Sequence, residues 1–271
     1  MVFSPAAIAW GPTGHRIVGA LAEQHLQPAA REKVRVILQG YKLQDVGTWA
    51  DDIKSETTSF YRSFYNWHAM EIDDPDIWHA SAVDTNVWPK NLRMALYYCI
   101  EQLQRQPEQA RLQKEVLLKM LVHLVADAHQ PLHVGNGRDR GANYCYVRWF
   151  GTKYAIKLHQ VWDSKLIEFT RLSYTEYTDY LDHVSAEDIT KWQHDSIDTW
   201  LLESRRLHAD IYPSYGSYSP ESYCSEDGKP VPFKQMPTIS FRYIYANRPV
   251  LEQRLQQAGI RLAGVLNRLW G

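Results

Sequence analysis

The segment LVHLVADAHQPLH, residues 121–133, carries metal-binding side chains among apolar residues. His123 and Asp127 are four residues apart, so on a helix they project from the same face. Pro131 should end that helix within a turn. His133 then lies just after the end of the helix, where its side chain can point back toward His123 and Asp127. Burying these side chains is unfavourable unless each gains a partner or a metal ion. The segment therefore predicts a buried metal centre at the end of a helix.

A second segment, KLHQVWD, repeats the same spacing with His159 and Asp163. Imidazole and carboxylate groups both ligate zinc, and one helical turn separates two such donors by a suitable distance. With His133 they make three ligands, the usual number for a catalytic zinc that keeps one position open. A structural hydrogen bond within either pair is the alternative. Because both pairs lie among apolar residues, we favour the metal.

The elements that must position these residues are mostly helical. Apolar residues recur every three or four positions, as an amphipathic helix requires, in six segments. These segments are 14–26, 90–104, 113–129, 157–169, 186–208 and 249–270, the last with Pro249 in its first turn. One β-hairpin is predicted from YVRWF (146–150) followed by YAIKL (154–158), and residues 211–240, rich in Tyr, Ser and Pro, are expected to form a long loop. These patterns favour a single, mainly α-helical domain.

The composition narrows the class of protein. The chain has 271 residues, of which 45% are hydrophobic, enough for a sizeable core. Its 30 basic and 31 acidic residues give a net charge of −1. That balance argues against tight electrostatic binding of duplex nucleic acid, since such affinity depends on many phosphate contacts by Lys and Arg. No apolar run reaches the length of a membrane span. No motif implies a protein partner, so we expect a monomer.

The chain begins MVFSPAAIAW, in which Ala7, Ile8 and Ala9 form the small-x-small pattern that precedes a signal-peptidase cut. The basic and apolar regions of a complete signal are missing. Residues 1–9 are therefore interpreted as the remnant of an export signal that is cleaved before Trp10, and an ordinary frayed terminus is the alternative. Cleavage would make this an exported protein, periplasmic or secreted.

Three cysteines are too few for a disulfide framework, and none forms a CxxC zinc motif. Cys145 and Cys224 both flank loop-like segments, whereas Cys99 lies in a helical pattern. In an exported protein, one disulfide between Cys145 and Cys224 is therefore expected.

Five motifs follow one another from the first tryptophan to Asp163. They are W-G-x-x-G-H at 10–15, W-A-D at 49–51, W-H at 67–68, H-x-x-x-D-x-x-Q-P-L-H at 123–133 and L-H-x-x-W-D at 158–163. In this order they resemble the S1/P1 nuclease family, and the final RLAGVLNRLW resembles the C-terminus of that family. The likeness covers residues 10–271, the expected catalytic domain. It implies a mainly α-helical fold, shared with zinc-dependent phospholipase C, that holds three zinc ions in one cleft.

The resemblance assigns ligands to each ion. They are Asp51, His68, His123 and Asp127 for one zinc, His133, His159 and Asp163 for the second, and His15, Asp127 and the α-amine and carbonyl of Trp10 for the third. The third set requires Trp10 to be the first residue, because an acylated nitrogen is a far poorer ligand than a free amine. The W-A-D motif selects Asp51 over the adjacent Asp52. His129, on the opposite face of its helix, is expected not to be a ligand.

Three residues are expected to contact the substrate. Lys54 falls where fungal members of the family carry an arginine that contacts the scissile phosphate; lysine keeps the charge but lacks the bidentate fork. Asn143, in GAN, matches a family asparagine near the substrate. Tyr144 is a candidate for stacking on an unpaired base, a contact that contributes roughly 1–3 kcal/mol.

The resemblance implies hydrolysis of single-stranded DNA and RNA at the P–O3′ bond, which leaves 5′-nucleotides, together with 3′-nucleotidase activity. We expect Asp51 to orient the attacking water, and clustered cations suit a phosphate ester because its charge grows on oxygens. The alternative within the same fold is a zinc-dependent phospholipase C. Against it, Asp163 stands where that branch usually has Glu, and the spacing from Trp10 to His15 is short, as in the nucleases. A non-enzymatic zinc-binding helical protein is a less favoured alternative.

Overall fold

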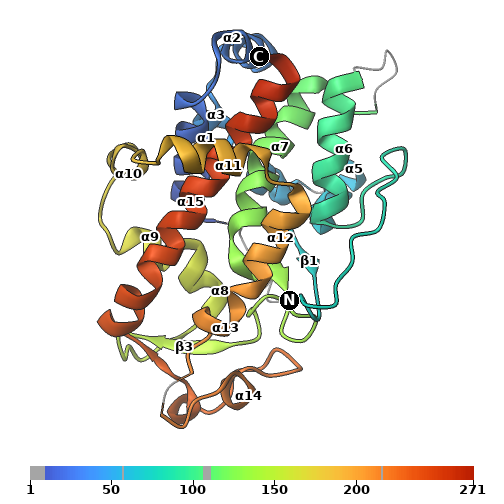
Figure 1. The fold of residues 1–271 in the computed structure, drawn as a ribbon. Coiled ribbons are helices and arrows are strands. Elements are labelled where there is room, and N and C mark those ends of the chain that lie inside the picture. Colours follow the sequence, from blue (N-terminus) through green and yellow to red (C-terminus); the bar gives the residue numbers. More distant parts are fainter. Residues whose placement is uncertain (1–9, 57, 106–110, 215) are drawn as a thin grey trace.

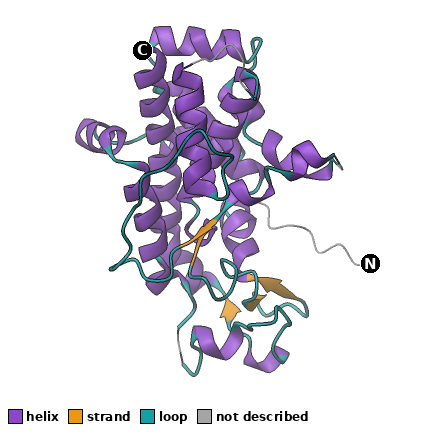
Figure 2. Ribbon diagram, turned by 90° about the vertical axis from the view of Figure 1, so that its right-hand side faces the viewer, coloured by secondary structure: helices purple, strands orange, loops and turns teal. Residues whose placement is uncertain are grey.

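The computed structural model describes residues 10–56, 58–105, 111–214 and 216–271, and within them the fold is mainly α-helical, as the sequence predicts (Figures 1 and 2). The expected remnant of an export signal, residues 1–9, lies outside the described residues. None of the helices within the described ranges is both long enough and apolar enough to cross a membrane.

Helices form most of the described structure, and strands are few and short. In chain order, the α-helices are α1 (Pro12–Gln24), α2 (Pro28–Ile37), α3 (Leu43–Val46), α4 (Trp49–Asp52), α5 (Ser59–Arg62), α6 (Leu92–Arg105), α7 (Lys114–His129), α8 (Leu158–Gln160), α9 (Leu166–Glu168), α10 (Tyr174–Leu181), α11 (Ala186–His194), α12 (Ile197–Arg206), α13 (His208–Ile211), α14 (Pro220–Tyr223) and α15 (Phe241–Trp270). The 3-10 turns are η1 (Ile53–Ser55), η2 (Tyr65–His68), η3 (Pro131–His133) and η5 (Phe233–Gln235), and η4 (Val161–Lys165) is a π-helical turn. The strands are β1 (Met70–Glu71), β2 (Val134–Gly135), β3 (Tyr146–Trp149), β4 (Ala155–Lys157) and β5 (Thr238–Ile239).

Helix α7 lies at the centre of the molecule (Figure 1), where α6, α12 and α15 pack on it together with α1 and α4. Every residue from Met120 to His129 is buried. A helix buried on all sides has no face open to water. His123 and Asp127 must therefore find their partners inside the protein.

The prediction that the last helix begins near Pro249 is wrong. Helix α15 begins at Phe241 and runs through Pro249 to Trp270. A proline inside a helix removes one backbone hydrogen bond and costs about 3 kcal/mol. Packing of the first turns offsets this, because Tyr243 and Ile244 are buried and the Tyr243 hydroxyl accepts the indole N–H of Trp162 at 2.9 Å.

Two other predicted helices are interrupted, so the prediction of one continuous α-helix is wrong in both places. The segment 186–208 divides into α11, α12 and the start of α13, because Ser196 caps a new helix by accepting the amide N–H of Thr199 at 3.1 Å. The segment 157–169 contains the π-helical turn η4 between α8 and α9. Such turns are rare and often lie at functional sites, and this one carries Asp163.

Strands β3 and β4 form the predicted hairpin, in which Val147 pairs with Ile156, and β5 joins β3 in parallel. The expected disulfide between Cys145 and Cys224 ties the start of the hairpin to the predicted loop 211–240, in which the described elements are all short. The hairpin ends directly at α8, so it positions the helical turn that carries His159.

A second pair of strands has no signal in the sequence. Strand β1 pairs in parallel with β2, with Met70 opposite Val134. This pair joins the residues that follow His68 to the residues that follow His133. Two segments that are far apart in the chain are therefore held side by side next to the end of α7.

Candidate metal centre

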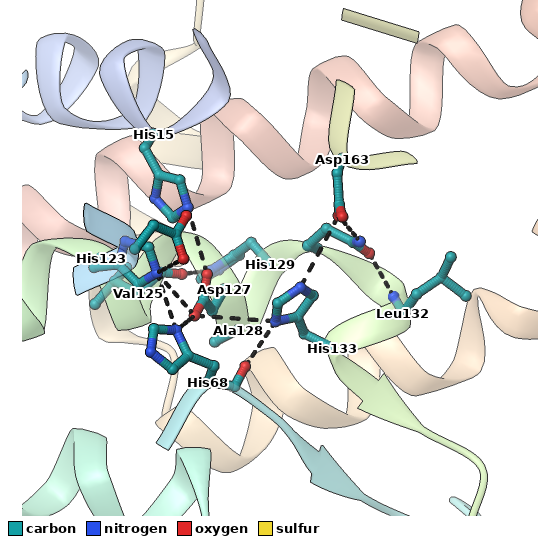
Figure 3. A network of polar contacts seen from close by, with 12 residues as sticks. His15, His68, His123, Val125, Asp127, Ala128, His129, Leu132, His133 and Asp163 are labelled. Atoms are coloured by element: carbon teal, nitrogen blue, oxygen red, sulfur yellow. Dashed lines mark hydrogen bonds and ion pairs between the residues drawn. The ribbon is translucent and has the colours of Figure 1, made fainter. Parts of the chain in front are cut away.

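The eight predicted side-chain ligands come together at the last turns of α7. Figure 3 shows His15, His68, His123, Asp127, His133 and Asp163 gathered in one region. The donor atoms form three groups, each with its members within 4.8 Å of one another: His15, His123 and Asp127; Asp51, His68 and His123; and His133, His159 and Asp163. The structure thus brings together side chains of all three predicted ligand sets.

Asp127 lies between these groups and has no exposed surface. Its Oδ1 is 3.6 Å from Nε2 of His15, while its Oδ2 is 3.0 Å from Nδ1 of His68 and 3.3 Å from Nε2 of His123. The same Oδ2 is 3.9 Å from Nδ1 of His133. One carboxylate therefore faces a different set of histidines with each of its two oxygens.

The group formed by His133, His159 and Asp163 lies beside the first two. Nε2 of His159 is 3.3 Å from Oδ2 of Asp163, and Nε2 of His133 is 4.0 Å from Oδ1 of the same carboxylate. The two imidazole rings are 5.0 Å apart between centroids. Three donors from η3, α8 and the π-helical turn η4 thus face a common point.

Backbone carbonyls orient three of the imidazoles. The Nδ1–carbonyl pairs are His123 with Gly47 at 2.8 Å, His133 with His68 at 2.6 Å, and His159 with Gly141 at 2.6 Å. A carbonyl oxygen only accepts, so each Nδ1 carries the proton and each Nε2 keeps its lone pair. Such contacts fix the tautomer and ring orientation of metal-binding histidines.

The buried amide of Gln130 orients Asp163. Its Nε2 donates to Oδ1 of Asp163 at 2.5 Å, and its Oε1 accepts the backbone N–H of Leu132 at 2.6 Å. The second carboxylate oxygen of Asp163 then remains directed at His159. Gln130 lies in the Q-P-L-H motif, but residue type and spacing alone do not distinguish an amide that orients a carboxylate from one that only packs in the core.

The loop that supplies the Gly141 carbonyl has an unusual backbone. Arg140, Gly141 and Ala142 have φ values of +52°, +59° and +59°, in the left-handed region that L-residues other than glycine rarely adopt. A Cβ at Gly141 would lie 2.0 Å from the carbonyl oxygen of Leu132. Glycine is therefore required at this position both for its conformation and for the space.

Gly141→Ala is expected to lower zinc affinity at this group by about 10- to 100-fold, because the collision moves the carbonyl that orients His159. Competition with a chromogenic chelator measures the affinity. Gly151→Ala is the matched control: Gly151 also has a positive φ, +67°, but a Cβ there has no atom within 4 Å. Equal losses in the two variants would contradict an effect through His159.

Burial keeps most of the clustered histidines neutral. It lowers the pKa of His15, His68 and His133 well below the usual histidine value, and it lowers the pKa of His159 to about 4. Neutral imidazole is the form that ligates a metal ion. At His123 burial acts in the same direction, but the nearby carboxylates outweigh it and raise the pKa.

The acids of the cluster respond to burial in the opposite direction. Burial raises the pKa of Asp163 well above its usual range and also raises the pKa of Asp127. Several buried polar atoms have no hydrogen-bond partner within the described part of the chain; they include Nε2 of His15, His133 and His159, and Oδ1 of Asp127. A divalent cation would supply the missing partner for these lone pairs and neutralise the buried carboxylates, so the residues fit a metal centre.

His208 is a buried histidine outside the three groups. Its Nε2 donates to the carbonyl of Pro131 at 3.0 Å, and burial lowers its pKa to about 4. In the unfolded chain the pKa returns to about 6.5, so between pH 6.5 and pH 4 the unfolded state binds more protons than the folded state. The stability associated with neutral His208 is therefore lost as the pH falls through this range.

Between pH 7 and pH 4, the free energy of unfolding of the metal-free wild type should fall by about 3 kcal/mol more than that of His208→Gln. Urea titrations at a series of pH values measure both. Parallel pH dependences for the two proteins would show that His208 does not titrate in this way.

His129 is buried but is not part of any of the three groups, as expected. Its Nδ1 donates to the Val125 carbonyl at 2.7 Å, and its Nε2 accepts from Arg261 at 3.0 Å. The end of α7 is held by neighbouring contacts, since the Ser204 hydroxyl donates to the Ala128 carbonyl at 2.6 Å. Polar contacts on this side thus anchor the helix that carries Asp127.

A cavity of about 420 Å³ opens beside the ligand groups, within the usual size range of small-molecule sites. Its walls include His68, His133 and His159, together with Lys54 and Asn143, two of the three expected substrate contacts. Polar wall residues that the sequence did not single out are Tyr65, Asn66, Glu71, Lys90, Asn91 and Arg140. None of them is one of the residues that define the five motifs, so their place in the cavity wall is visible only in the fold.

Asp51 and its neighbours are placed as the motif suggests. Oδ1 of Asp51 is 3.7 Å from Nε2 of His123 and 2.6 Å from Nζ of Lys54. The adjacent Asp52 is exposed and accepts from the Thr48 hydroxyl at 3.3 Å. Of the two neighbouring acids, Asp51 is the one in the cluster.

Tyr144 is not brought to the cavity. Its ring packs against Gly228, where an added Cβ would lie 2.7 Å from the ring, and the guanidinium of Arg140 lies 5.5 Å from the ring centroid. Tyr144 therefore packs against the disulfide-linked loop at Gly228 and does not belong to the cavity wall, and its expected base-stacking role stays a prediction.

Comparisons with known proteins agree with the site. The model of the S1/P1 Nuclease family matches residues 10–271. Endonuclease 2 of Arabidopsis thaliana is 28% identical over 288 residues, covering 99% of this chain and 93% of that protein. Endonuclease 1 of the same plant is 29% identical, covering 96% and 87%. Nuclease S1 of Aspergillus oryzae is 24% identical over 268 residues, covering 95% and 91%. The family match spans every residue of the three ligand groups.

Proposed function

Because the chain belongs to the S1/P1 nuclease family, we propose that the cavity beside the three ligand groups hydrolyses phosphodiester bonds of single-stranded DNA and RNA. The protein is a nuclease and therefore a hydrolase that acts on phosphate esters. The observation that carries the proposal is the convergence of three groups of histidines and acids at the end of α7, beside a cavity whose wall includes His68, His133 and His159.

Three zinc ions are the proposed cofactors. The ligands would be Asp51, His68, His123 and Asp127 for the first ion, His133, His159 and Asp163 for the second, and His15, Asp127 and the amine and carbonyl of Trp10 for the third. The chemistry of the donors supports zinc, since neutral imidazole and carboxylate are its common nitrogen and oxygen ligands. When bound, zinc supplies Lewis-acid charge that favours ionisation of water and neutralises phosphate oxygens.

The protein side chains position the reactants around this charge. Asp51, which is paired with the cavity residue Lys54, would accept a hydrogen bond from the attacking water and orient it toward phosphorus. Lys54 brings a permanent positive charge to the same place, since its Nζ is 2.6 Å from Asp51. Asn143, in the cavity wall, would hold the substrate by its amide. Attack in line with the P–O3′ bond would release the 3′ oxygen and leave a 5′-phosphate, with 3′-nucleotidase activity following from the same geometry.

Export and cleavage before Trp10 are part of the proposal. The disulfide between Cys145 and Cys224 is typical of an oxidising compartment. The family match begins at Trp10, which is the residue that the third zinc would bind through its free amine. These two points support export and a mature chain of 10–271, and we propose that this chain acts as a monomer.

Activity of the purified chain beginning at Trp10 tests the function. The protein is stripped with a chelator, and zinc is added back before assay on single-stranded DNA, single-stranded RNA, duplex DNA and phosphatidylcholine vesicles. We expect zinc-dependent release of 5′-nucleotides from both single-stranded substrates and a much lower rate on duplex. Hydrolysis of lipid alone would identify a phospholipase C instead, and bound zinc without hydrolysis would indicate a metal store.

A matched pair of variants connects the activity to the site. Asp51→Asn should abolish most of the zinc-dependent activity, whereas Asp52→Asn changes the adjacent exposed acid and should retain it. Equal effects of the two substitutions would contradict the role assigned to Asp51.

A further inference from the structure

We propose that Lys90 and Arg140 bind phosphates next to the scissile one, so that the enzyme favours a polynucleotide over a substrate with a single phosphate. The inference rests on the proposed nuclease function and adds a subsite for flanking phosphates to it. Nothing in the motifs points to these two residues; their placement in the fold does.

Both cations line the same cavity as the ligand groups. Lys90 and Arg140 belong to its wall together with His68, His133 and His159. They come from separate segments: Lys90 lies two residues before the start of α6, and Arg140 lies in the loop between β2 and β3. A strand whose scissile phosphate reaches these histidines would therefore bring its flanking phosphates to the wall that holds Lys90 and Arg140.

Neither cation is neutralised by an acid. Lys90 and Arg140 are both exposed, and within the described ranges no carboxylate oxygen lies within 4.0 Å of either side-chain nitrogen. Glu71 also lines the cavity, but its carboxylate accepts the backbone N–H of Gly137 at 2.8 Å. The chain as a whole has a net charge of −1, so attraction for a polyanion has to come from local charges of this kind.

The backbone at Arg140 is fixed in an unfavourable conformation. Its φ of +52° lies in the left-handed region, and strained residues of this kind cluster at functional sites. The loop is held by Asp139, whose Oδ1 accepts the N–H of Ala142 at 2.8 Å, and by Gly141, whose carbonyl binds His159. The loop conformation that orients His159 therefore also fixes the position of the Arg140 backbone, from which its side chain extends.

The backbone on both sides of Lys90 is held by hydrogen bonds of its neighbours. The preceding Pro89 is buried, and its carbonyl accepts the indole N–H of Trp67 at 3.1 Å. The following Asn91 directly precedes α6 and caps it, because its side-chain oxygen accepts the N–H of Met94 at 3.0 Å. A charge on a rigid backbone loses less conformational freedom when it binds, so it contributes more of its attraction to affinity.

The two substrates that separate this role from catalysis are a dinucleoside monophosphate and a single-stranded decanucleotide. The first carries only the scissile phosphate, whereas the second carries flanking phosphates as well. For each protein the measured quantity is the ratio of kcat/KM on the decanucleotide to kcat/KM on the dinucleoside monophosphate. Any general damage to the metal centre affects both substrates and cancels in this ratio.

Lys90→Gln and Arg140→Gln should each lower the ratio by about threefold to fivefold through the KM for the decanucleotide, as expected for one exposed charge contact. Each should also reduce the slope of log(kcat/KM) against log salt by about 0.7 on the decanucleotide. Arg140→Lys, which keeps the charge, should restore most of the ratio. Arg138→Gln is the matched control, because Arg138 is exposed and two residues away but does not line the cavity, and it should leave ratio and slope unchanged.

An unchanged ratio and salt slope in the Lys90→Gln, Arg140→Gln double variant would overturn the inference while leaving the nuclease function in place. A decrease of the kcat/KM ratio in Arg138→Gln as large as that in Arg140→Gln would also overturn the inference. If the wild type hydrolyses neither substrate, the proposed function fails and the inference fails with it. Zinc content, measured on every variant, identifies any disturbance of His159 by the substitution at Arg140.

Discussion

Replacing Asp127 by asparagine is expected to lower kcat/KM on single-stranded DNA by roughly 10³-fold, since metal ions contribute several kcal/mol to such reactions and each 1.36 kcal/mol is tenfold. Asp127 is fully buried and directs one oxygen to His15 and the other to His68 and His123. An amide keeps the shape but removes the negative charge and one acceptor. Metal analysis should then find about two fewer zinc ions per chain, because this carboxylate is proposed to be shared by two sites.

The stability of the same variant separates a metal effect from misfolding. Burial raises the pKa of Asp127, so the charged carboxylate is unfavourable when no cation is bound. The metal-free Asp127→Asn protein should therefore be at least as stable to heat as the metal-free wild type. Asp182→Asn is the control: this aspartate also pairs with a histidine, at 2.7 Å from His25, but away from the site. Full zinc content or full activity in Asp127→Asn would contradict the bridging role.

Retention of residues 1–9 is expected to have the next largest effect on zinc content and on nuclease activity. A chain that begins at Trp10 should bind about three zinc ions, and a chain that keeps the nine preceding residues should bind about one fewer and be roughly 10- to 100-fold less active. The physical reason is that a free amine offers a lone pair, whereas the nitrogen of a peptide bond does not. Metal analysis of both chains, with N-terminal sequencing of the exported protein, makes the comparison.

Acetylation of the chain that begins at Trp10 provides the control for added length. It removes the lone pair with only a few atoms, so the acetylated chain should lose zinc and activity to the same extent as the longer one. If the longer chain and the acetylated chain both bind as much zinc as the free amine, the third site does not use the terminus.

In the metal-free cluster, burial favours the neutral form of the histidines, which binds metal, but disfavours the ionised form of the carboxylates, which also binds metal. Neutral histidines and buried acids with raised pKa values are what burial alone produces. Zinc binds carboxylates in their deprotonated form, so the affinity for zinc should fall as the pH decreases. The eight side chains that would hold the metal come from seven different structural elements.

The ligand residues could be predicted from the sequence because their spacing is local or their motifs are distinct. The four-residue separations of His123 from Asp127 and of His159 from Asp163 place each pair on one face of a helix or helical turn. The hairpin over β3 and β4 and the pairing of Cys145 with Cys224 were also predictable, since alternation and flanking loops are short-range signals.

Where local signals competed with packing, the sequence was a poorer guide. Pro249 marks a helix start by its lack of an N–H, yet burial of Tyr243 and Ile244 extends α15 past it to Phe241. The chain from 186 to 208 has helical periodicity throughout, but Ser196 divides it by capping a new helix. Tyr144 packs against the loop at Gly228 and lies outside the cavity wall, a placement that the sequence did not predict.

The sequence by itself determined which residues can ligate metal and the order in which they follow one another, because residue type and helical spacing are local properties of the chain. Only the tertiary structure decided how they are oriented. The parallel pairing of β1 with β2 holds His68 beside His133, the left-handed turn at Gly141 aims a carbonyl at His159, and the same cavity gains Lys90 and Arg140 from two further segments. Those contacts join residues far apart in the chain, and no periodicity encodes them, since they form only when separate elements pack around α7.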